Sequence, residues 1–116
     1  RTNFAVVGST PVEVHPDTLE PVVGVPIPKF DLALRTAVRA ADLTELGYVG
    51  ADVVIDAARG PMILELNARP GLAIQLANRK GLGPRLAAIG DRAPIASRSD
   101  ADERIALGLE IARSTA

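Results

Sequence analysis

The sequence predicts an α+β fold in which an antiparallel sheet carries helices packed on one face. Two apolar runs, residues 50–56 and 61–67, are separated by four residues that are typical of a hairpin turn. A helical pattern precedes them over residues 31–46, and another follows Asp100. Strands joined by so short a turn pair antiparallel, so we expect the helices to cover the apolar face of the resulting sheet.

The composition fits one small domain or part of a larger one. A chain of 116 residues can bury a core, but its aromatic residues are only Phe4, Phe30 and Tyr48, so the packing must be mainly aliphatic. A net charge of −1 with scattered basic residues disfavours nucleic-acid binding, and no apolar run is long enough to cross a membrane. The absence of cysteine excludes disulfides and cysteine zinc sites and, with no visible signal peptide, favours a cytoplasmic protein.

The N-terminal part of the chain is expected to be extended. Residues 4–7 and 12–14 favour short strands that form a hairpin. Residues 15–29 are rich in proline and favour an extended or turning connection. His15 is the single histidine and lies in a turn, where an exposed polar role is the commoner explanation.

Residues 31–46 have the spacing of an amphipathic helix. Asp31 is the expected N-cap, and Gly47 is the expected stop. The apolar face, which should cover the sheet, consists of Leu34, Val38 and Ala41. The polar face consists of Arg35, Arg39 and Asp42.

Further helices are expected toward the C-terminus. Residues 72–79 and 84–89 favour short helices, and residues 90–98 favour a linker. Asp100, with Ser99 before it and two acidic residues soon after it, is a capping signal for a final helix. The apolar side of that helix is expected to consist of Ile105, Leu109 and Ala112.

Strand alternation gathers oxygen-bearing side chains on one face of the predicted hairpin. If residues 57–60 form the turn, Asp52 lies opposite Glu65, and Asn67 projects on the same side as Glu65. Asp56 falls at the turn, where it is expected to cap the turn rather than bind a metal. The same register gives the other face a continuous apolar surface of Val53, Ile55, Met62 and Leu64.

Directly opposed carboxylates repel each other unless a cation compensates them. Oxygen ligands select a hard ion such as Mg²⁺ or Mn²⁺, with phosphates and water completing its coordination. We therefore expect Asp52, Glu65 and Asn67 to form a metal site. Arg69, whose planar fork of donors suits phosphate, would reach the same face on an extended backbone. Solvated acids are the alternative, but the shared face, the register and the nearby arginine favour the metal site.

These residues carry a family resemblance. Asp52, followed by Glu65-Leu66-Asn67-Ala68-Arg69-Pro70-Gly71, resembles the metal-binding end of the ATP-grasp ligases. The chain is most similar to the alpha-L-glutamate ligase-like, RimK-related group. That similarity is carried by His15-Pro16-Asp17-Thr18, by Leu46-Gly47-Tyr48-Val49-Gly50 and by residues 67–78.

The resemblance implies that residues 1–90 are the C-terminal portion of an ATP-grasp catalytic domain and that residues 91–116 are a linker and a C-terminal helix. The implied enzyme is a carboxylate–amine ligase that uses ATP to form an acyl-phosphate, which an amine, with glutamate as a candidate, converts to an amide. Asp52, Glu65 and Asn67 would bind one or two Mg²⁺ ions that bridge the ATP phosphates. Arg69 would be the catalytic residue that contacts ATP and steadies the transferring phosphoryl group.

The chain lacks the nucleotide-clamping features that normally precede this segment in the family. Lys29 is the only lysine before Asp52, and no glycine-rich loop follows it. The chain also begins with Arg1 rather than Met. We therefore expect a part of a ligase that is inactive without a missing N-terminal lobe. A non-catalytic binding or assembly module derived from ATP-grasp, and a small divalent-cation-binding protein, remain as alternatives.

Overall fold

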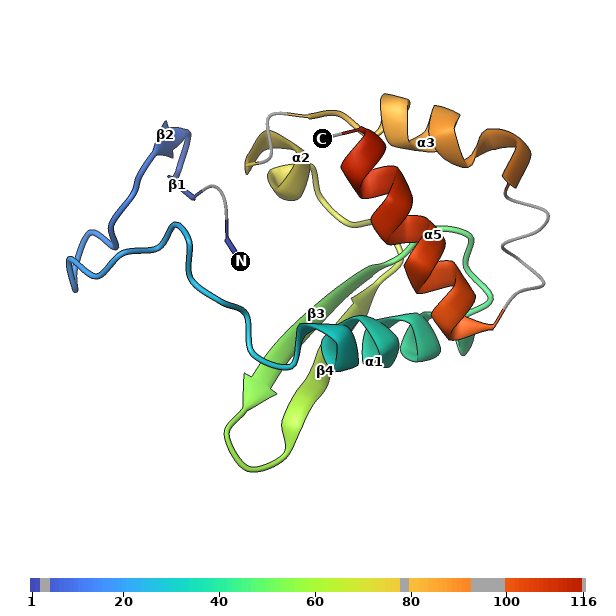
Figure 1. The fold of residues 1–116 in the computed structure, drawn as a ribbon, viewed down its shortest axis with the longest axis horizontal. Coiled ribbons are helices and arrows are strands. Elements are labelled where there is room, and N and C mark those ends of the chain that lie inside the picture. The colour runs from blue at the N-terminus through green and yellow to red at the C-terminus, as the bar shows by residue number, and fades with distance from the viewer. Residues whose placement is uncertain (3–4, 78–79, 93–99, 116) are drawn as a thin grey trace. The chain divides into compact units, whose positions relative to one another are not determined.

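The computed structural model describes residues 1–2, 5–77, 80–92 and 100–115. The described residues form two antiparallel two-stranded sheets and a set of helices, which confirms the α+β class (Figure 1). The chain divides into two compact units, Arg1–Pro28 with Gly71–Gly81, and Lys29–Pro70 with Leu82–Ala116. Among the described helices, none is long and apolar enough to cross a membrane.

The first unit begins with the predicted hairpin. Strands β1 (Val6–Val7) and β2 (Thr10–Pro11) pair antiparallel, so the turn has two residues where the sequence predicted four. Gly8 opens that turn with a φ of 61°, a conformation that glycine adopts without steric strain and that two-residue hairpin turns require. Of the expected first strand, residue 4 lies outside the described residues.

The proline-rich connection contains a second, longer turn. Val14 and Pro21 form an isolated antiparallel bridge, and the His15 backbone N–H donates to the Glu20 carbonyl at 2.8 Å. The His15 imidazole Nδ1 accepts the backbone N–H of Asp17 at 3.2 Å. His15 is therefore exposed and polar, as expected, and its imidazole stabilises the turn in which it lies. Later in the same unit, helix α2 (Ala73–Ala77) lies within the predicted 72–79.

In the second unit, helix α1 (Phe30–Asp42) packs on the hairpin of β3 (Gly50–Asp56) and β4 (Gly60–Asn67), as predicted (Figure 1). The predicted apolar residues of α1 are all half-buried: Leu34, Val38 and Ala41. The helix thus covers one face of the hairpin and leaves the other to solvent.

The predicted bounds of this helix are wrong at both ends. Lys29, with a left-handed φ of 51°, is the N-cap, and Asp31 lies in the first turn without capping the helix. The helix ends at Asp42, four residues before the predicted end. The Leu43 backbone N–H bonds back only three residues, and the left-handed φ of 55° at Glu45 cannot continue a helix.

The β3–β4 register changes by one residue along the hairpin. On one side of the change Asp52 pairs with Glu65, and on the other Val53 pairs with Ile63, so Leu64 is an extra residue in a β-bulge. The predicted apolar surface is therefore correct for Val53 and Ile55 on β3 but wrong for Met62 and Leu64 on β4. Because of the bulge, Val53 pairs with Ile63 and Ile55 pairs with Pro61, and both partners are half-buried. Leu64, by contrast, is 67% exposed.

The turn between the two strands is also tighter than predicted. Asp56 pairs with Gly60 rather than Pro61, and Gly60 has a φ of 81°. The Asp56 Oδ1 accepts the backbone N–H groups of Ala58 at 2.9 Å and Arg59 at 2.7 Å. The expected turn-capping role of Asp56 is confirmed.

The C-terminal helices follow the predicted order. Helix α3 (Gly83–Ile89) continues into a short 3₁₀ turn, η1 (Gly90–Arg92), and α5 spans Ala101–Ser114. The Asp100 Oδ1 accepts the backbone N–H groups of Asp102 and Glu103 at 2.8 and 2.9 Å, so the predicted cap is confirmed. Of the predicted linker, residues 90–92 form η1, and residues 93–98 lie outside the described residues.

Ion pairs orient α5 differently from the prediction. The Arg104 guanidinium donates to both carboxylate oxygens of Asp42 at 2.6 Å, and Arg35 donates to Asp102 at 2.8 Å. The hydrogen bonds from Arg104 hold the pKa of the Asp42 carboxyl below its usual value. Arg35 and Asp42, from the predicted polar face of α1, therefore pair with α5 while their side chains stay partly exposed.

The predicted apolar side of α5 is consequently wrong in part. Ile111, seven residues after Arg104 and so on the same helix face, is buried at 6% exposure. Leu109 and Ala112 are exposed, and only Ile105 of the predicted set is half-buried. The ion pairs with α1 orient this face toward the protein interior. The sequence of α5 alone contains no sign of these partners.

Gly108 leads to a stability prediction. It lies in the middle of α5, and a Cβ added there would meet no atom within 4 Å. Gly108→Ala should therefore raise the free energy of unfolding by about 0.5–1 kcal/mol, because glycine is a poor helix residue. Urea unfolding would measure the change, with Ala106→Gly, also on an exposed part of α5, expected to lower stability by a similar amount. A stability loss in Gly108→Ala would contradict the open space at this position.

Candidate functional site

The β3–β4 hairpin brings the predicted acidic residues together. Asp52 and Glu65 are directly opposed in the strand register, and Asn67 pairs with Gly50 two positions along. Asp52, Glu65 and Asn67 are all exposed on the face that α1 does not cover. The bulge lies immediately beyond the acidic pair, so the register predicted from sequence holds where the site requires it.

Within the described part of the chain, no cationic or hydrogen-bonding group compensates either facing acid. No ion pair or hydrogen bond joins Asp52 or Glu65 to another described residue. Carboxylates opposed in this way on neighbouring strands repel each other. The pair therefore leaves negative charge that an added cation would neutralise.

The third oxygen ligand has a local partner. The Asn67 Oδ1 accepts the backbone N–H of Arg69 at 2.9 Å, which forms a small turn at the end of β4. The chain bends at Ala68 and Arg69, so the extended backbone expected to carry Arg69 onto the acidic face is wrong. Arg69 remains exposed, and its backbone is tied to Asn67 rather than continuing the strand.

Gly50 allows this bend to fold back on β3. A Cβ at Gly50 would lie 2.8 Å from the Cβ of Pro70, which is closer than real side chains approach. The segment that carries Arg69 therefore packs against the start of β3, two residues from Asp52. The sequence contains no local sign of this role for Gly50, because close backbone approach between distant residues leaves no local pattern.

Leu64 is the other residue at this face that sequence alternation missed. The bulge places it directly before Glu65 with most of its side chain in solvent. An exposed leucine beside two acids offers an apolar surface next to the charged one. Only the register shift reveals this position, because regular alternation predicts Leu64 on the buried face.

The donor set fits a hard divalent cation. Among the described residues no three His, Cys, Asp or Glu side chains gather, so the set consists of two carboxylates and one amide oxygen. Mg²⁺ is commonly bound by one or two carboxylates together with substrate phosphates and water. Asp52, Glu65 and Asn67 satisfy that requirement without a fourth protein ligand.

The uncompensated acids give a second stability prediction. Asp52→Asn should leave the free energy of unfolding unchanged or raise it by up to about 0.5 kcal/mol without metal, because a repulsion is removed. Asp102→Asn is the matched control and should be destabilising, since Asp102 pairs with Arg35. Both would be measured by urea unfolding in the presence of a chelator. A clear loss of stability in Asp52→Asn would show that this carboxylate has a structural partner.

Comparison with known proteins places the chain in a family. Residues 1–91 match a family model over α1, the β3–β4 hairpin and α3, and the model is one of the ATP-grasp families. The chain belongs to the family described as Sugar-transfer associated ATP-grasp. No curated protein and no solved structure matches the chain. The predicted ATP-grasp relationship is confirmed, whereas the match does not single out the RimK-related group.

Proposed function

We propose that the β3–β4 hairpin supplies the Mg-ATP phosphate-binding face of an ATP-dependent carboxylate–amine ligase. The observation that carries this proposal is the uncompensated Asp52–Glu65 pair, with Asn67 on the same open face. Membership of an ATP-grasp family supports ATP as the nucleotide. Localisation in the cytoplasm, where ATP is abundant, is part of the same proposal.

Each of the four residues has one role in the proposed reaction. Asp52, Glu65 and Asn67 would hold Mg²⁺ or Mn²⁺, which when bound neutralises phosphate charge and orients the transferring group. Arg69 would direct its guanidinium at oxygen atoms on which negative charge develops. The acids place negative charge where the ion is needed, and Gly50 lets the segment bearing Arg69 approach them.

The proposed chemistry has two steps. A substrate carboxylate oxygen attacks the γ-phosphorus of ATP, the bond to the β-phosphate oxygen breaks, and ADP leaves. An amine nitrogen then attacks the acyl-phosphate carbonyl, inorganic phosphate leaves, and the nitrogen loses a proton to give the amide. Phosphoryl transfer depends mainly on positioning and charge stabilisation, which matches a site made of carboxylates, an amide and an arginine.

Two acceptor amines are candidates for the second step. Glutamate follows from the resemblance to glutamate ligases, and the family description associates the domain with sugar transfer. An amino sugar therefore joins glutamate as an acceptor to be tested. Contacts to adenine are assigned to a further lobe of the protein, since the chain has only Lys29 and no glycine-rich loop before Asp52.

Metal binding can be tested on the chain itself. Mn²⁺ titration followed by ¹⁵N-resolved NMR should broaden resonances at residues 50–54 and 63–68 first, and Asp52→Asn should reduce that broadening. Asp17→Asn, which changes an exposed acid of the other unit, is the matched control and should have no effect. Equal broadening around all exposed acids would reject a specific metal site.

Catalysis requires the full-length protein. With ATP, Mg²⁺, a panel of carboxylates and hydroxylamine, an acyl-phosphate would be trapped as a hydroxamate with release of one ADP. Glutamate or an amino sugar would then replace hydroxylamine. Mg-ATP binding without hydroxamate or ADP for any carboxylate would instead assign the domain to the non-catalytic binding module.

A further inference from the structure

A concave site lies between α3 and α5 and shares no lining residue with the acidic hairpin face. The pocket has a volume of about 360 Å³, within the range of small-molecule sites. None of the four proposed ligase residues lines it. Its lining consists of Arg85, Ile89, Arg104, Leu107, Gly108, Ile111 and Ala112.

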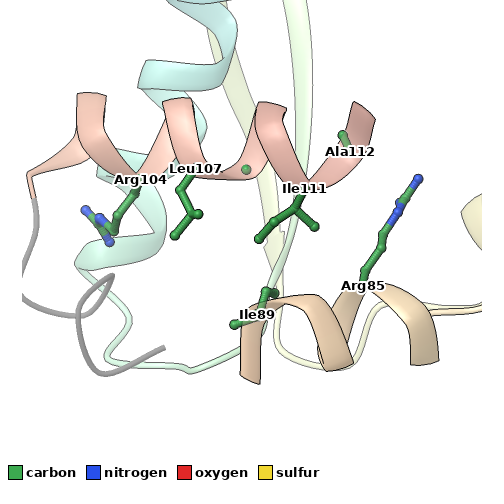
Figure 2. Close-up of a pocket in the computed structure, with 7 residues that line it drawn as sticks. Arg85, Ile89, Arg104, Leu107, Ile111 and Ala112 are labelled. Carbon is green, nitrogen blue, oxygen red and sulfur yellow. The ribbon is translucent and has the colours of Figure 1, made fainter. Parts of the chain in front are cut away.

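The pocket wall is mainly aliphatic. Leu107 and Ile111 point from α5 toward α3, and Ile89 points from α3 toward α5 (Figure 2). The end of α3 is tied to α5 through η1, where Arg92 donates to Glu110 at 2.8 Å. The two helices therefore flank an open apolar groove that suits a hydrocarbon chain.

The two arginines of the lining differ in their partners. Arg104 is engaged by Asp42 through two hydrogen bonds. Arg85 is half-buried and makes no ion pair or hydrogen bond with any described residue. Figure 2 shows its side chain extending from α3 toward the end of α5 that carries Ala112. An anionic group at that end of the pocket would give Arg85 its partner.

Gly108 provides an independent observation. Glycine weakens a helix interior, yet no neighbouring atom requires its small size, because an added Cβ would meet nothing within 4 Å. Its backbone has no positive φ that would require glycine. The absence of a side chain at Gly108 instead leaves open volume in the pocket wall.

We propose that the α3–α5 pocket binds a small anionic amphiphile, specifically a carboxylate with a medium-length aliphatic chain. The chain would contact Ile89, Leu107 and Ile111, and the carboxylate would pair with Arg85. Because α5 lies beyond the residues that match the ATP-grasp family model, the pocket combines a family helix with one outside the match.

The test uses butyrate, hexanoate and octanoate with the 116-residue chain, followed by NMR titration. Each added methylene should lower the dissociation constant about 1.5- to 2-fold if it is partly buried, and up to about fourfold if it is fully buried. Shifts should concentrate on residues 83–89 and 104–112. n-Octanol, which keeps the chain but lacks the charge, should bind about tenfold more weakly than octanoate.

Two variants separate the charge from the cavity. Arg85→Gln should weaken octanoate about tenfold and leave n-octanol unchanged, whereas Gly108→Leu should weaken both by filling the pocket. Gly108→Ala is the control for the helix, because it keeps most of the volume and should retain octanoate binding. Arg113→Gln, which changes an arginine of α5 outside the lining, should have no effect.

Three results would overturn the proposal. The first is equal weakening of octanoate by Arg85→Gln and Arg113→Gln, which would indicate general charge attraction. The second is affinity that does not depend on chain length. The third is an absence of shifts on α3 and α5 at millimolar octanoate while the thermal midpoint shows that the chain is folded.

Discussion

Arg69→Lys is expected to lower kcat of the proposed full-length ligase by about 10²–10³-fold while changing KM for ATP much less. Lysine keeps the positive charge but loses the planar fork that can donate two parallel hydrogen bonds. An interaction made mainly in the transition state affects kcat rather than ground-state binding. Steady-state kinetics with ADP release as the readout would measure both constants.

The matched control is Arg59→Lys, which changes an exposed arginine in the turn at the opposite end of the same hairpin. Its kinetics should equal those of the unchanged enzyme. Gly50→Ala should lower kcat without removing any charged group, because the new Cβ would displace Pro70 and the bend that carries Arg69. A rise in KM alone in Arg69→Lys would assign Arg69 to substrate binding.

Ile111→Ala is expected to lower the free energy of unfolding by about 2–3 kcal/mol. Ile111 is the most buried apolar side chain among the described residues, and truncating a buried isoleucine removes contacts and leaves a cavity. We expect a loss near the lower end of the usual range for isoleucine-to-alanine substitutions, because Ile111 already borders an open pocket. Urea unfolding monitored by circular dichroism would measure it.

Leu109→Ala is the control for this prediction, because Leu109 lies on the same helix but is 36% exposed. It should lower stability by less than half as much. Equal losses in the two variants would mean that α5 does not dock through the face that carries Ile111 and Arg104.

The local features of the site could be predicted from sequence. The predicted pairing of Asp52 with Glu65 is observed, but through two departures that offset each other: the turn is one residue tighter than expected, and the Leu64 bulge restores the register beyond it. The Asp100 cap and the Asp56 turn depend only on residues two or three positions away. Such interactions are visible in any sequence window that contains both partners.

The features that could not be predicted depend on distant residues. The buried face of α5 is set by Arg104 and Asp42, which are 62 positions apart, so periodicity within α5 selected the wrong face. Likewise, Gly50 meets Pro70 only after the hairpin has formed. The bulge at Leu64 is a third case, since residues 61–64 are an uninterrupted apolar run in which no residue marks the change of register.

The bulge has a consequence for what the hairpin needs. If Leu64 were deleted, Ile63 would still face Val53 and Glu65 would still face Asp52, so every strand pair observed in the structure would persist in one regular ladder. Leu64 is therefore dispensable for strand pairing, unlike any other residue of β4 between Gly60 and Asn67. Its contribution must lie in the extra twist that a bulge adds and in the apolar side chain it presents beside the acids. A hairpin shortened by deletion of Leu64 would keep the strand pairs and the Asp52–Glu65 pair but lose the neighbouring apolar surface. Folding and the proposed phosphate-binding face would therefore place different requirements on this one residue.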